Sequence, residues 1–164
     1  MEIVKYFLVS RVKGRGKRKI MIKSIIGFFK YNTEKGMTIK SYIYAAFFRF
    51  CILVLKKQKL EKMLGERNQE SSYEETEEHY KIAKMVARHV NRIAGNTPWE
   101  SKCLVRAMTA QKLLAEKKIQ TTLYLGVGTD EKGGMRAHAW LRCGKFCVTG
   151  EGDTGCSVVA KFLK

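Results

Sequence analysis

Residues 96–114 read NTPWESKCLVRAMTAQKLL, a stretch that combines helix-start signals with a cysteine. Its apolar residues recur every three to four positions, which predicts a helix with one apolar face. Two start signals compete. Thr97 with Glu100 forms a capping-box pattern with proline at the first helical position, whereas Ser101 as N-cap places Cys103 in the first turn. There, backbone amides favour a thiolate and lower the pKa of a cysteine.

Strand-like segments follow this helix. Residues 121–128 (TTLYLGVG) are rich in β-formers, and residues 136–143 (RAHAWLRC) alternate between apolar and polar positions. The segment between them, residues 129–134 (TDEKGG), has the composition of a hairpin loop. We expect a third strand at residues 145–149 and a fourth at residues 157–163.

A helix of about 20 residues is expected before the cysteine-bearing one. Two overlapping capping-box patterns in residues 71–75 (SSYEE) predict its start, and Gly95 predicts its end. One apolar stripe runs along it, and His89 falls off that stripe. We therefore expect His89 at the surface.

An apolar segment lies nearer the N-terminus. Thirteen residues from Ile43 to Leu55 are interrupted only by Arg49. A membrane-spanning helix needs about 20 apolar residues, so this segment is short for a span and carries a charge in its middle. We interpret it as a buried helix, and its flanking lysines leave open a peripheral contact at a membrane surface.

The order of these elements, helices first and antiparallel strands last, indicates an α+β fold. Three parts are expected along the chain. Residues 1–19 form a basic, mobile arm, residues 20–70 a helical N-terminal subdomain, and residues 71–164 a domain of helices and strands.

Charge is distributed unevenly over the 164 residues. The net charge is +17, and residues 1–62 hold 16 Lys or Arg against 3 Asp or Glu. Such a surplus attracts nucleic acid, anionic lipid or an acidic peptide without choosing among them. We favour a solvated arm over nucleic-acid contact for residues 1–19.

Five cysteines with no secretory signal peptide before them indicate a reducing, cytoplasmic location.

Cys103 and His138 are the candidates for chemistry. A nucleophilic cysteine with a distant histidine is a recurrent enzyme pattern, although a packed core cysteine and a packed core histidine are the alternatives. A third group should orient the imidazole. Glu151 and Asp153 are the acids downstream of His138, and we prefer Asp153.

A zinc site is disfavoured. Cys143, Cys147 and Cys156 with His138 would supply ligands, but the spacing C-x-x-x-C is not that of a zinc knuckle. No phosphate-binding loop or dinucleotide motif is present in the sequence.

The motifs NTPWESKCLVRAMTAQKLL, TTLYLGVG, AHAWLRCG, VTG and VVAKF together resemble the transglutaminase-like domain of lasso-peptide biosynthesis, the C-terminal domain of the microcin-processing B protein, in its stand-alone form. A helical segment ending in KMLG extends the resemblance to residues 20–163. It implies a papain-like cysteine peptidase fold that needs no cofactor. It also implies removal of the leader from a precursor peptide, delivery of that precursor by a separate leader-recognition protein, and ring closure by an ATP-dependent macrolactam synthetase.

The resemblance also assigns roles to residues. It makes Cys103 the nucleophile and His138 the general base. The acid of the family does not transfer, because Gly150 stands near the expected position.

Overall fold

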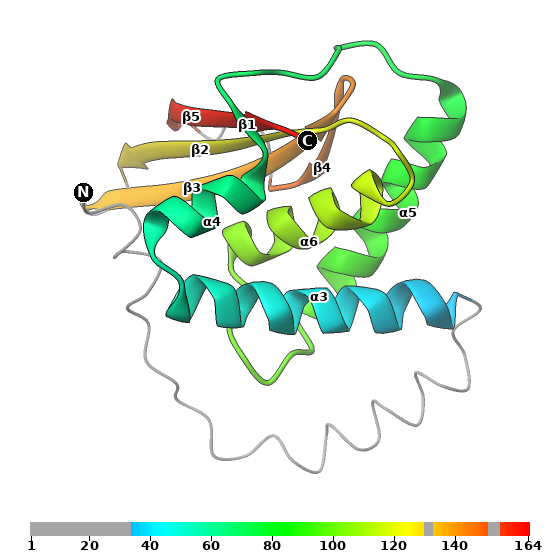
Figure 1. Ribbon diagram of the computed structural model, residues 1–164, viewed down its shortest axis with the longest axis horizontal. Coiled ribbons are helices and arrows are strands. Elements are labelled where there is room, and N and C mark those ends of the chain that lie inside the picture. Colours follow the sequence, from blue (N-terminus) through cyan, green and yellow to red (C-terminus); the bar gives the residue numbers. More distant parts are fainter. Residues whose placement is uncertain (1–33, 130–132, 151–154) are drawn as a thin grey trace.

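The computed structural model describes residues 34–129, 133–150 and 155–164. Within them the helices precede most of the sheet, which is the expected α+β order (Figure 1). The elements are α3 (Lys35–Val54), α4 (Lys57–Leu64), β1 (Glu66–Arg67), α5 (Glu77–Ala94), α6 (Cys103–Ala115), β2 (Thr122–Thr129), β3 (Met135–Cys143), β4 (Phe146–Thr149) and β5 (Ser157–Leu163).

The strands form one antiparallel sheet in the order β1-β5-β2-β3-β4. Its four longer strands confirm the four that the sequence predicts. The short strand β1 pairs Glu66 with Leu163 of β5, and no strand was expected there. A Cβ on Gly65 would lie 2.0 Å from the carbonyl oxygen of Leu163, so only glycine lets the chain pass this close to β5. Two exposed polar residues carry no strand pattern, which is why β1 was missed.

Helix α6 lies at the centre of the molecule. It packs against β3 and β4 on one side and against α3 and α5 on the others (Figure 1). Most of its residues are therefore buried, on nearly every side of the helix. The α3, α5 and α6 helices share one core cluster with the inner face of the sheet. The boundary predicted at residue 70 stays a prediction.

Helix α5 begins later than the sequence suggests. Thr76 is its N-cap, and the Thr76 hydroxyl accepts a hydrogen bond from the amide of His79 at 3.2 Å. The capping-box patterns in residues 71–75 were wrong, since Ser72 instead accepts from the amide of Glu74 within a turn.

His89 is buried, which corrects the expectation that it is a surface residue. Its Nδ1 hydrogen-bonds the hydroxyl of Thr38 at 2.8 Å, and its Nε2 pairs with Glu34. Both partners belong to the start of α3. The apolar stripe of α5 marks the face that packs on the core, whereas His89 lies on a second face that α3 covers.

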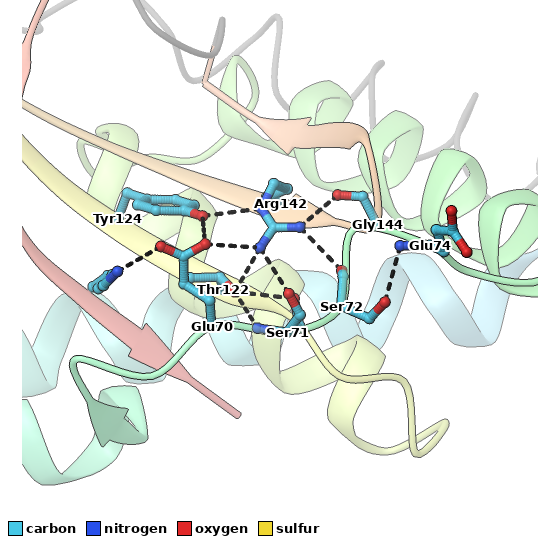
Figure 2. Close-up of polar contacts among 9 residues, drawn as sticks. Glu70, Ser71, Ser72, Glu74, Thr122, Tyr124, Arg142 and Gly144 are labelled. Atoms are coloured by element: carbon cyan, nitrogen blue, oxygen red, sulfur yellow. Dashed lines mark hydrogen bonds and ion pairs between the residues drawn. The ribbon is translucent and has the colours of Figure 1, made fainter.

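Arg142 attaches the segment before α5 to the sheet (Figure 2). Its guanidinium donates to the carbonyl oxygens of Ser71, Ser72 and Gly144 at 2.7 to 3.1 Å. It also donates to Glu70 at 3.3 Å and lies 3.8 Å from the centre of the Tyr73 ring. A buried guanidinium is stable only when its donors are satisfied in this way. Figure 2 shows Glu70, Ser71 and Ser72 converging on the guanidinium from the loop, and Thr122 and Tyr124 of β2 are further acceptors.

Several expectations lie outside the described residues. These are the basic arm at residues 1–19, the preferred acid Asp153 and its alternative Glu151.

Candidate active site

Cys103 is the first residue of α6. The first hydrogen bond of the helix runs from the Arg106 amide to the Lys102 carbonyl at 3.1 Å. The amides of residues 103–105 therefore have no acceptor within the helix. Lys102, the N-cap, makes no side-chain capping hydrogen bond. Of the two helix starts that the sequence left open, the one that places Cys103 in the first turn is confirmed, but its N-cap is Lys102 and not Ser101.

The competing helix start at Thr97 is wrong. The Thr97 hydroxyl donates to the carbonyl of Trp99 at 2.8 Å and pairs with the Ser101 hydroxyl at 2.9 Å, which closes a loop instead of capping a helix. Trp99 packs edge-on against Tyr42 of α3, with ring centroids 5.2 Å apart. This loop attaches the start of α6 to α3.

The thiol of Cys103 lies against the backbone of Ala139 in β3. Burial raises the pKa of this thiol above its ordinary value, while hydrogen bonds with the Ala139 and Leu104 backbone and the charge of Arg106 lower it by less. The net shift is upward, which is opposite to the expectation from the helix start alone. The resting sulfur is therefore a thiol, and a neighbouring base must take its proton before it attacks.

His138 precedes Ala139 on β3. Its imidazole stacks on the indole of Trp140, with ring centroids 5.8 Å apart and planes 20° apart. Trp140 stacks in turn on Tyr124 of β2, with centroids 5.3 Å apart. The rings form a row on the face of the sheet turned away from the core, because side chains alternate along a strand and Ala139 faces inward.

The edge of β3 is not paired with β4 at this point. In the strand pairing, β4 contacts only Leu141–Cys143, so the edge at His138 and Ala139 lies beyond its end. The structure thus brings the thiol of Cys103 to the residue next to His138. The catalytic roles of the two residues stay predictions.

Gly150, the first residue after β4, closes this end of the site. Its φ is +77°, and a Cβ there would lie 2.6 Å from the Cβ of Trp140 and 3.1 Å from Nε2 of His138. The main chain therefore passes directly beside the imidazole, where only glycine fits. Sequence reasoning noted Gly150 only as a missing acid. It also did not predict that Trp140 stacks on His138 or that the backbone of Ala139 contacts the Cys103 thiol. Neither contact leaves a local pattern in the sequence.

The cysteines other than Cys103 do not gather into a metal site. Cys143 lies in the main core, whereas Cys147 and Cys156 pack near Trp140 on the other face of the sheet. Among the residues that the structure describes, no group of three or more His, Cys, Asp or Glu side chains is placed to hold a metal ion.

Comparison with known protein families identifies the fold family of this chain. The family described as the transglutaminase-like superfamily matches residues 49–160, more than half of the chain. The matched range contains Cys103, His138 and Gly150 together with the strands that position them. No curated protein and no solved structure matches the chain.

Proposed function

The chain belongs to the transglutaminase-like superfamily, and from this we propose that it is a cysteine peptidase that removes the leader from a ribosomally made lasso-peptide precursor. The superfamily includes cysteine peptidases and acyltransferases. The observation that carries the proposal is the position of Cys103 at the start of α6, with its thiol against the residue that follows His138. The motifs PWESKCLVRA and AHAWLRCG support the finer assignment to leader cleavage.

The proposed reaction proceeds in two steps. His138 takes the proton of the Cys103 thiol, and the sulfur attacks the carbonyl carbon at the junction of leader and core. The imidazolium then protonates the leaving amine, which frees the N-terminus of the core peptide. The leader remains as a thioester on Cys103 until water hydrolyses it to a carboxylic acid.

The first turn of α6 supports the charged states of this reaction. The tetrahedral intermediate carries an oxyanion that needs hydrogen-bond donors. The amides of residues 103–105 have no helical acceptor and point out of the helix start, so the Cys103 amide is the donor nearest to the attacked carbonyl. The upward shift in the pKa of Cys103 makes a base obligatory, which is the role proposed for His138.

The proposal places the protein in the cytoplasm with three partners. The precursor peptide is its substrate, and a separate leader-recognition protein delivers it. An ATP-dependent macrolactam synthetase then closes the ring on the amine that the cleavage frees.

The test is reconstitution with the precursor and the leader-recognition protein, followed by mass spectrometry of the products. We expect Cys103→Ala and His138→Ala to abolish leader release. Cys51→Ala, which removes a buried thiol from α3, is the matched control and should retain it. Leader release by Cys103→Ala would refute the proposal, whereas release by His138→Ala alone would remove only the base assignment.

The same assay separates hydrolysis from acyl transfer, the alternative activity within this superfamily. Hydrolysis leaves a free carboxylate at the end of the leader, and acyl transfer to an added primary amine leaves an amide. A non-enzymatic basic protein would give neither product.

A further inference from the structure

Helix α3 has two different faces. One packs on the core through six buried residues, Thr38, Ser41, Ala45, Phe48, Cys51 and Ile52. The other carries large apolar side chains that are 42% to 62% exposed. These side chains, which we call the outer stripe, are Ile39, Ile43, Phe47, Phe50, Leu53 and Val54.

The outer stripe is continuous. Ile39, Ile43, Phe47, Phe50 and Val54 follow one another at intervals of three or four residues, which places them on one side of a helix. Helix α3 lies on the side of α6 that faces away from the sheet, so the stripe is on the outside of the molecule (Figure 1). A contiguous exposed apolar surface of this kind marks an interaction site.

Lysines bracket the outer stripe. Lys35 stands at the start of α3, and Lys56, Lys57 and Lys59 follow its end, all of them exposed. No acidic residue occurs in residues 35–59. Glu34 directly precedes Lys35, and Lys57 pairs with Glu61 at 3.6 Å, so the positive charge gathers at the C-terminal end of α3. A surface that is apolar along its length and positive at one end complements a layer of hydrocarbon beneath anionic headgroups.

We propose that the outer stripe docks on an anionic phospholipid bilayer, with α3 lying along the surface. Within the described ranges, α3 is the one helix long and apolar enough to cross a membrane, with a mean hydropathy of 1.4 over 18 residues. Its inner face, however, packs on α5 and α6, and Arg49 pairs with Glu100 at 3.7 Å. If α3 crossed the bilayer, these contacts would be broken, whereas a helix that lies along the surface keeps them.

A bilayer fits this surface better than a second copy of the chain does. Two copies meeting through their outer stripes would bring the flanking lysines of each copy toward those of the other. Like charges at close range disfavour such a contact, whereas anionic headgroups are attracted by the same lysines.

Vesicle flotation of the full chain tests the proposal. We expect binding to vesicles of phosphatidylcholine and phosphatidylglycerol in equal parts, and weaker binding to phosphatidylcholine alone. Phe47→Ser with Phe50→Ser should weaken binding to the mixed vesicles at least ~10-fold for each phenylalanine. The matched control is Val158→Ser with Val159→Ser, which removes two exposed apolar side chains from β5 and should leave binding unchanged.

A charge variant tests the attraction between the lysines and the anionic headgroups. Lys56→Gln with Lys57→Gln and Lys59→Gln should weaken binding about fivefold for each lysine, the factor that corresponds to about 1 kcal/mol. Circular dichroism spectra and melting curves establish that each variant is folded.

Four results would overturn the proposal. They are absence of binding to the mixed vesicles, unchanged binding by the double phenylalanine variant, unchanged binding by the triple lysine variant, and a dimer in solution that the double phenylalanine variant converts to a monomer. The last result would assign the outer stripe to a second copy. None of these readouts depends on leader cleavage, so the outcome is independent of the proposed function.

Discussion

The imidazole of His138 lies on the indole of Trp140, with the two ring planes 20° apart. Tyr124 of β2 stacks on the same indole, with ring centroids 5.3 Å apart. The orientation of the imidazole therefore depends on Trp140, two residues further along the same strand. The orientation of the indole depends in turn on Tyr124 in the neighbouring strand.

Replacing Trp140 tests this dependence. We expect Trp140→Leu to lower kcat of leader cleavage about tenfold with little change in KM, because loss of the stacking contact frees the imidazole to rotate. Trp140→Phe keeps an aromatic face and should retain most of the activity. The assay is run below the melting temperature of both variants. Equal kcat for Trp140→Leu and the wild type would show that the indole does not position His138.

Gly150 can be compared with Gly133, a glycine with nearly the same φ. Gly150 has φ +77° and would place a Cβ 2.6 Å from Trp140, whereas Gly133 has φ +76° and would meet nothing within 4 Å. We expect Gly133→Ala to cost only the backbone strain, about 1 kcal/mol. Gly150→Ala should cost about 1 to 3 kcal/mol more, because the chain or the indole must move. Chemical denaturation measures both, and equal costs would contradict the contact.

Arg142 is expected to be essential for stability. Arg142→Met leaves the buried carbonyls of Ser71 and Gly144 and the partly buried carbonyl of Ser72 without their donor, which should lower the free energy of unfolding by about 3 to 5 kcal/mol. Arg67→Met is the matched control. The Arg67 side chain is 58% exposed and pairs with Glu61 at 3.9 Å, so its loss should cost less than about 0.5 kcal/mol. Urea titration measures the free energy of unfolding of both variants. An equal loss in the two variants would contradict the structural role of Arg142.

The pH dependence of alkylation tests the environment of Cys103. A raised pKa means that the thiolate forms only at higher pH than in an ordinary cysteine. In His138→Ala, the thiolate fraction at pH 7 should thus be below the roughly 3% of an ordinary thiol, and labelling by iodoacetamide should still rise above pH 9. The wild type should label faster at pH 7, because the base is present.

Cys143 provides an internal reference in the same experiment. Burial raises its pKa to about 11, and its side chain is inaccessible in the core, so it should stay unlabelled until the protein unfolds. Peptide mapping by mass spectrometry separates the two cysteines. A labelling plateau for Cys103 below pH 8 in His138→Ala would show that its own surroundings lower the pKa.

Local patterns were enough to predict much of this protein. The four longer strands and the existence of a helix that carries Cys103 follow from the periodicity of apolar side chains over a few neighbouring positions. The first turn was one of two starts that the sequence left open for this helix. Local patterns do not predict the pairing of β1 with β5 or the burial of His89, because each depends on a segment more than 50 residues away.

The site divides in the same way. The sequence alone determined which residues carry a thiol and an imidazole, and in which kind of element each stands. Only the tertiary structure decided that the thiol lies against Ala139, that its pKa shifts upward, and that Gly150 passes beside His138. The physical reason is that burial and close approach are properties of packed surfaces. The inward face of α6 and the edge of β3 create them together, and neither segment contains the information by itself.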